Sequence, residues 1–85
     1  MKLNNEIIVE RLENGGAALL DPEKEVIFLI NNTGFQILTS SIGHTRTEAQ
    51  ERFFNLVAHD FEDEDIDVYK EYLDQLIDNC ILLEE

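Results

Sequence analysis

Two histidines and one cysteine are the residues of this 85-residue chain with the widest chemical range. Imidazole titrates near neutral pH and can serve as a general base or a metal ligand. His44 follows a glycine and His59 ends a predicted helix, but neither has a cysteine nearby and no Ser-His-Asp pattern is present. We expect both to be surface residues without chemistry. Cys80 falls on the apolar side of a predicted helix, so we expect a buried small hydrophobic residue.

A run of acidic residues has part of the spacing of a calcium-binding loop. Asp63, Asp65 and Asp67 occupy positions one, three and five of such a loop, and Asp74 occupies position twelve. Position six is Val68, where the loop needs glycine for its sharp turn. Acidic residues also favour the positive end of a helix dipole, so we expect a helix start here. The sequence therefore predicts no metal, no cofactor and no enzymatic activity.

The charge balance restricts the partners of the chain. Its net charge is -13, and its six basic residues are scattered rather than clustered. Binding to phosphate backbones requires clustered Lys and Arg, so nucleic acids and anionic membranes are not expected partners. A neutral or basic peptide is easier to accept. No apolar run is long enough to cross a bilayer, and the first residues do not resemble a secretory signal, so we expect a cytoplasmic protein.

The stretch Val26–Ile30 is the strongest structural signal. Its five residues are all apolar, three are β-branched, and polar turn-forming residues stand on both sides. These features favour a strand. Alternate side chains of a strand point to opposite faces, so Val26, Phe28 and Ile30 share one face while Ile27 and Leu29 share the other. Because both faces are apolar, the second needs a partner from this chain or from another molecule.

The other elements follow from turn and periodicity signals. Glu6–Leu12 and Ala17–Leu20 are predicted strands joined by an Asn-Gly turn. Short connections favour an antiparallel meander with Val26–Ile30. A first helix, capped by Asn32 or Thr33, is predicted to end at Gly43, with Phe35, Leu38 and Ile42 on its inner face. A second starts at Thr45 or Thr47, because Thr47–Gln50 has the spacing of a capping box. A third runs from Asp63 to Asn79 or Cys80. The result is a single α+β domain over 1–85, a three-stranded antiparallel sheet followed by three helices.

The third predicted helix has an unusually wide apolar face. Tyr69, Leu76 and Cys80 lie near its centre, and Val68 and Tyr72 form one flank. The face covers about half the circumference, more than the ~100° stripe of a typical surface helix. This helix, like Val26–Ile30, is therefore predicted to have apolar surface that the domain itself does not cover.

The segment Ile30–Leu38 resembles a known family, the pyrroloquinoline-quinone biosynthesis protein D family of peptide-recognition domains. The matching residues are Asn31, Thr33, Gly34, Ile37 and Leu38, then Gly43, and in the last helix Tyr72, Leu73, Leu76 and Ile81-Leu82. The chain departs from the family pattern at Ile42, where the family has Asp, at Thr47, which arrives one residue late, and at Cys80, where the family has Gly.

The resemblance implies a winged helix-turn-helix fold without catalytic activity. It implies a domain that binds the leader segment of a ribosomally made precursor peptide and presents it to a modifying enzyme, often a radical SAM enzyme. The leader would add as a strand beside the third strand, above the third helix. The expected peptide-binding residues are Val26, Ile27, Phe28, Leu29, Ile30, Asn31, Val68, Tyr69, Tyr72 and Leu76.

Two alternatives use the same fold. A winged-helix DNA-binding regulator would need a basic recognition helix, yet around the second helix Arg46 and Arg52 stand against Glu48 and Glu51. A homodimer would pair the strand Val26–Ile30 with its own copy, because an exposed apolar edge invites such pairing.

Overall fold

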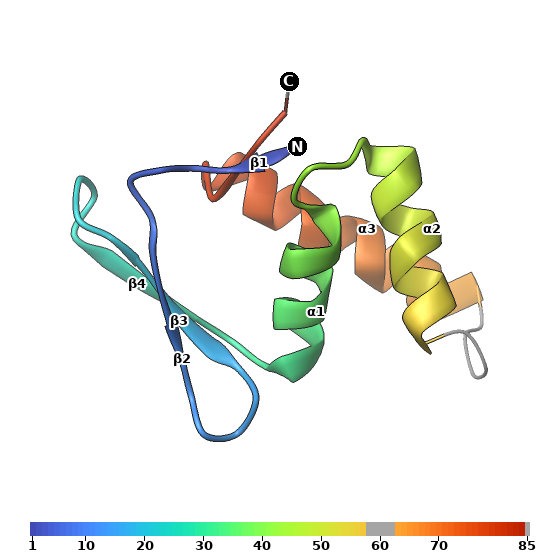
Figure 1. The fold of residues 1–85 in the computed structure, drawn as a ribbon, viewed down its shortest axis with the longest axis horizontal. Helices are drawn as coiled ribbons and strands as arrows, with labels where there is room; N and C mark the ends of the chain where they lie inside the picture. Colours follow the sequence, from blue (N-terminus) through green and yellow to red (C-terminus); the bar gives the residue numbers. More distant parts are fainter. Residues whose placement is uncertain (58–62, 85) are drawn as a thin grey trace.

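The computed structural model describes residues 1–57 and 63–84 and has an α+β fold. Three strands, β2 (Ile8–Arg11), β3 (Ala17–Asp21) and β4 (Val26–Ile30), form an antiparallel sheet in the order β2-β3-β4. Three helices follow, α1 (Asn32–Ser41), α2 (Arg46–Val57) and α3 (Asp63–Asp78). Figure 1 shows the sheet on one side of the molecule, with α1 between it and α2. The predicted three-stranded antiparallel sheet and the three helices are confirmed.

The first hairpin is built around the predicted Asn-Gly turn. The amide of Gly15 donates to the carbonyl of Leu12 at 3.1 Å, and the amide of Leu12 donates to the carbonyl of Gly16 at 3.0 Å. Gly15 has φ 89°, in the left-handed region that glycine adopts without steric cost. This is the three-residue hairpin loop in which a turn is followed by a left-handed residue.

Two short strands, one near each end of the chain, pair with each other and were not predicted. β1 (Lys2–Leu3) pairs antiparallel with β5 (Leu82–Leu83). The amide of Asn4 also donates to the carbonyl of Ile81 at 2.9 Å, so the two ends of the chain lie side by side (Figure 1). Strands of two residues have no periodicity, and only the approach of the chain ends creates the pairing.

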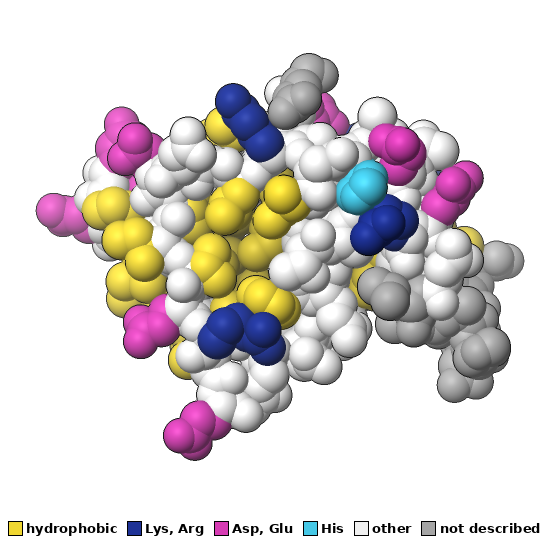
Figure 2. Space-filling model, in the orientation of Figure 1, with side chains coloured by type: hydrophobic (Ala, Val, Ile, Leu, Met, Phe, Trp, Pro, Cys, Tyr) yellow, Lys and Arg dark blue, Asp and Glu magenta, His cyan; other side chains and the backbone are white. Residues whose placement is uncertain are grey.

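The core lies between the inner face of the sheet and the three helices. Leu19, Leu38, Phe53 and Leu82 are among its almost fully buried side chains. Figure 2 shows that some apolar surface nevertheless stays uncovered, because hydrophobic side chains gather over the region of the sheet and α1. Acidic side chains lie mainly around the outline of that face.

The helices start within one residue of the predicted positions, but the cap of α1 and the capping box of α2 differ from those predicted. Asn31 caps α1, because its side-chain oxygen accepts from the amide of Gly34 at 2.8 Å, so the predicted caps Asn32 and Thr33 are wrong. At α2 the capping box is Thr45 with Glu48, not Thr47 with Gln50. The Thr45 amide donates to Glu48 Oε1 at 2.9 Å, and Thr45 Oγ1 accepts from the Glu48 amide at 3.2 Å.

The predicted inner face of α1 is partly wrong. Leu38 is buried, but Phe35 is half-buried and Ile42 is exposed. Ile42 lies after the last helical residue in an extended conformation, so it no longer follows the helical period, and Gly43 with φ 82° completes the predicted helix end. The residues of α1 that are buried are Gly34, Ile37, Leu38, Ser40 and Ser41.

The prediction that Cys80 is buried is wrong. Cys80 is exposed and has φ 59°, because it is the left-handed residue that ends α3. Its amide donates to Ile77 at 3.0 Å, and the amide of Ile81 donates to Leu76 at 2.9 Å. This pair of bonds is the Schellman motif, in which the residue after the left-handed position returns to the core. Ile81 is accordingly buried while Cys80 points outward.

Candidate functional site: a groove between β4 and α3

A groove of about 370 Å³ runs between β4 and α3. The two elements run in opposite directions along it. Lys24, before β4, reaches the carbonyl of Asn79 at the end of α3 with its Nζ at 3.4 Å. Gly34, after β4, lies against the ring of Tyr72, nearly two turns earlier in α3. The residues that line the groove are Ile27, Phe28, Leu29, Ile30, Tyr72, Gln75, Leu76, Asn79 and Ile81.

β4 is an edge strand along this groove. It pairs with β3 on one side, and among the residues that the structure describes no strand pairs with its other side. In an antiparallel strand alternate residues direct their N–H and C=O groups to opposite sides, so some of those groups of β4 face the groove side unpaired. Such an edge is a template for an added strand.

The two faces of β4 have different surroundings. Ile30 is buried and Phe28 packs partly against the core, so this face points to the helices. Ile27 and Leu29 lie on the outer face, where they are 63% and 75% exposed. The predicted alternation is therefore confirmed, and the outer face is the apolar surface that the domain leaves uncovered.

Gly34 allows Tyr72 to line the groove. A Cβ atom at Gly34 would lie 2.6 Å from Tyr72 Cζ and closer still to its hydroxyl oxygen. Glycine at this position therefore permits the ring of Tyr72 to lie directly on the first turn of α1. Burial raises the pKa of the Tyr72 hydroxyl.

Six of the ten expected peptide-binding residues line the groove. They are Ile27, Phe28, Leu29, Ile30, Tyr72 and Leu76. Asn31 caps α1 instead. Val26 starts β4 and is partly exposed, and Val68 is 61% exposed one turn before Tyr72, so both lie on the same elements without lining the groove.

Tyr69 belongs to the core rather than to the groove. It is 2% exposed, and its ring stacks on Phe53 with 4.9 Å between the ring centroids. Burial raises the pKa of its hydroxyl. Tyr69 precedes Tyr72 by three positions, about 300° around the helix, and packing against α2 assigns it to the buried side.

Three lining residues were missed, namely Gln75, Asn79 and Ile81. Gln75 and Asn79 follow Tyr72 by three and seven positions, so they lie on the same side of α3. The spacing can be read from the sequence, but a binding face identified by its apolar residues leaves polar residues such as these out. Ile81 enters the groove only because the chain reverses at Cys80.

The groove is uncharged in a strongly acidic protein. None of its nine lining residues is ionisable near neutral pH, although 29% of the chain is charged. Glu71 lies on α3 one turn before Gln75, and Lys24 lies at the other end. The lining therefore favours an apolar or neutral ligand, because an unpaired charge packed against it would lose hydration without compensation.

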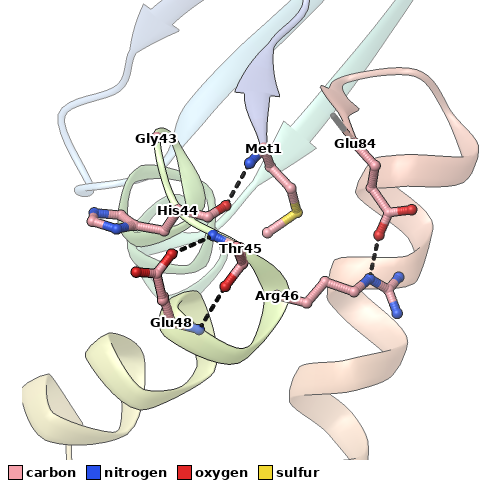
Figure 3. A pocket seen from close by; sticks show the side chains of 7 residues that line it. All are labelled: Met1, Gly43, His44, Thr45, Arg46, Glu48 and Glu84. Carbon is pink, nitrogen blue, oxygen red and sulfur yellow. Dashed lines mark hydrogen bonds and ion pairs between the residues drawn. The ribbon is translucent and has the colours of Figure 1, made fainter.

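A second cavity, of about 410 Å³, surrounds the start of α2 and is shown in Figure 3. Its polar groups already bind one another. The N-terminal amine of Met1 donates to the carbonyl of His44, and Arg46 Nε donates to Glu84 at 2.6 Å. Bonds from Thr45 lower the pKa of Glu48, and the bond to Asp74 raises the pKa of Arg46. These contacts link the start of α2 to Met1 and Glu84, so most polar groups of this cavity are bound within the fold.

A third cavity, of about 390 Å³, separates α2 from α3. It is bordered by both signs of charge, including Arg46, Glu51, Lys70 and Asp74. Arg46 Nη2 is held by Asp74 at 2.5 Å, so it is not available as part of a basic recognition surface. This arrangement gives no support to a DNA-reading role for α2.

The catalytic candidates do not form a site within the described residues. His44 contributes its backbone carbonyl to the Met1 contact, while His59, and the side chains of Asp63 and Asp65, lie outside what the structure describes. Among the residues whose side chains the structure describes, no group of three or more His, Cys, Asp or Glu could hold a metal ion. No helix within residues 1–57 and 63–84 is long and apolar enough to cross a membrane.

Comparison with protein-family models, curated proteins and solved structures finds no significant match to this chain.

Proposed function

We propose that this protein is a non-catalytic binding module that captures the leader segment of a ribosomally made precursor peptide and presents it to a modifying enzyme, for example a radical SAM enzyme. The observation that carries the proposal is the uncharged groove of about 370 Å³ along the open edge of β4. The resemblance of Asn31–Leu38 and the last helix to the pyrroloquinoline-quinone biosynthesis protein D family supports the same function.

Capture works by strand addition. The peptide backbone bonds to the unpaired groups of β4, which gives affinity that depends little on sequence. Alternate side chains of the peptide enter the groove between Phe28 and the α3 residues Tyr72 and Leu76, which gives specificity. The order of one antiparallel sheet followed by three helices fits a winged helix-turn-helix domain, which we include in the proposal.

The opposite edge of the sheet fits this role less well. β2 is also an edge strand, but none of the described cavities is lined by its residues. An added strand would find backbone groups there but none of these three cavities for its side chains. The β4 edge combines unpaired backbone groups with an adjacent groove for side chains.

The same open edge favours one alternative, a homodimer in which β4 pairs with β4 of a second copy. Two chains of net charge -13 repel each other, which weakens such a dimer at low salt. Such a dimer would double the molecular mass in solution, and added peptide would return the protein to a monomer.

The other alternative, DNA binding, is tested by a mobility-shift assay at low salt, which should show no complex.

The test is a titration of isotope-labelled protein with synthetic leader segments of short open reading frames adjacent to its gene. We expect amide shifts concentrated in Val26–Ile30 and in residues 72–81. Gln75→Lys, at an exposed position in the groove, should weaken binding roughly tenfold or more, because a lysine there must be desolvated beside apolar side chains.

Thr39→Lys is the matched control, since it makes a similar change on the exposed side of α1 away from the groove. It should leave the affinity unchanged. Shifts confined to α2, or equal weakening by both substitutions, would contradict the proposed function.

A further inference from the structure

The outer face of the sheet carries an apolar surface that the proposed function has not used. Opposite residues of antiparallel strands point to the same face, so the register places Ile8, Leu20 and Ile27 in one row. Glu10, Ala18 and Leu29 form the next row, so the apolar part of this row lies toward β4. Ile8, Ile27 and Leu29 are 56%, 63% and 75% exposed, and two of these three belong to the edge strand β4.

This face is too small to hold a second copy of the protein. Three strands about 4.8 Å apart and about 17 Å long cover roughly 14 × 17 Å. A stable interface needs about 800 Å² from each partner. A single added strand needs no such area, because its backbone bonds to the strand edge.

A strand added to β4 has two faces. The residues that alternate with the groove-facing ones lie on the outer face, directly opposite Ile27 and Leu29, with Cβ atoms about 5 Å away. Polar residues there would leave Ile27 and Leu29 in water. Apolar residues would cover their sides, as cross-strand pairs do within a sheet.

We propose, building on the function above, that the peptide class captured at β4 is apolar on both faces over the paired segment rather than alternating between apolar and polar residues. One set of side chains enters the groove, and the other packs beside Ile27 and Leu29. The groove lining is uncharged, so charged residues of the peptide lie outside this segment. The net charge of -13 favours basic residues at those flanks.

The experiment compares two synthetic peptides of equal length and equal charge, both flanked by lysines. The two-sided peptide has about five consecutive apolar residues, the length of β4. The one-sided peptide has threonine at alternate positions, which keeps a high strand propensity. We expect the two-sided peptide to bind roughly 2- to 30-fold more tightly, the range for two cross-strand pairs.

The protein variant Ile27→Thr/Leu29→Thr tests the location of this preference. It should remove most of the difference in affinity between the two peptides. The affinity for the one-sided peptide should fall much less, and any fall is expected because Ile27 and Leu29 also border the groove. Ile8→Thr is the matched control, since it removes a similar exposed side chain from the same face at the opposite edge. It should change neither affinity.

The outcomes separate the two proposals. Equal binding of both peptides, or equal loss for both in the double variant, would overturn the two-sided class while leaving capture at β4 intact. If neither peptide binds and amide shifts are absent from β4 and α3, both the proposed peptide capture at β4 and the proposed peptide class are overturned. Circular dichroism of each variant verifies that the fold is kept.

Discussion

At the scale of single residues, the groove depends on a glycine that does not line it. Gly34 sits in the first turn of α1, and Tyr72 occupies the space that a side chain there would fill. Alanine is normally better than glycine inside a helix by about 1 kcal/mol. The choice of glycine is therefore explained by the close approach of Tyr72 and not by helix formation.

We expect Gly34→Ala to destabilise the protein by about 1–3 kcal/mol, the usual cost of overpacking, despite the better helix propensity. The tyrosine ring must also move within the groove, so peptide affinity should fall. Urea unfolding and peptide titration measure the two effects.

Tyr72→Phe provides the matched test, because it removes the hydroxyl that lies nearest to the added methyl group. The double variant should recover part of the stability lost by Gly34→Ala. Simple addition of the two single effects would contradict the proposed clash.

At the scale of elements, α2 starts with a charged capping box. The Glu48 carboxylate accepts from the Thr45 amide, and this bond lowers the pKa of Glu48 below its usual 4.5. A carboxyl group whose pKa is lowered by folding stabilises the folded state at pH values above the pKa that the group has in the unfolded chain. That contribution is lost as the pH falls from about 4.5 through the lowered pKa.

We expect Glu48→Gln to be less stable than the natural protein at pH 7 and to lose this difference below the usual pKa of glutamate. The reason is that glutamine keeps an acceptor but not the charge that the helix start favours. Thermal unfolding across acidic pH measures the difference. Glu51→Gln, on the exposed surface of the same helix, is the control and should show a smaller pH-dependent difference. A Glu48→Gln deficit that stays constant with pH would contradict the assignment.

At the scale of the whole molecule, the charge is unbalanced. The chain has 19 acidic and six basic residues. The ion pairs found among the described residues both use Arg46, which contacts Asp74 and Glu84. Most carboxylates therefore repel one another across the surface, which disfavours the compact state.

We expect the melting temperature to rise when sodium chloride is increased from a few millimolar to about 0.15 M, where screening acts within ~8 Å. A gain of about 1 kcal/mol would correspond to about 4–8 °C for a domain of this size. Calorimetry measures the shift. The variant Glu71→Gln/Asp78→Gln, which removes two exposed charges from α3, should show a smaller rise. A melting temperature that falls with salt would mean that attractive pairs outweigh repulsion.

The sequence by itself determined the three strands of the sheet, the three helices and their order, because local signals specify them. Alternating apolar faces define β4, an Asn-Gly turn defines the first hairpin, and periodicity defines the three helices. The sequence also indicated apolar surface on Val26–Ile30 and on the third helix. Six residues expected from these two elements and the family resemblance do line one groove.

Only the tertiary structure decided which of those apolar surfaces is covered. Tyr69 is buried because α2 packs on it, whereas Tyr72 lies in the groove because Gly34 leaves room for it. Cys80 points outward because the chain must reverse at that position, and the β1–β5 pairing exists only because the chain ends meet. Periodicity shows which residues are apolar, but burial depends on contacts between segments far apart in the chain.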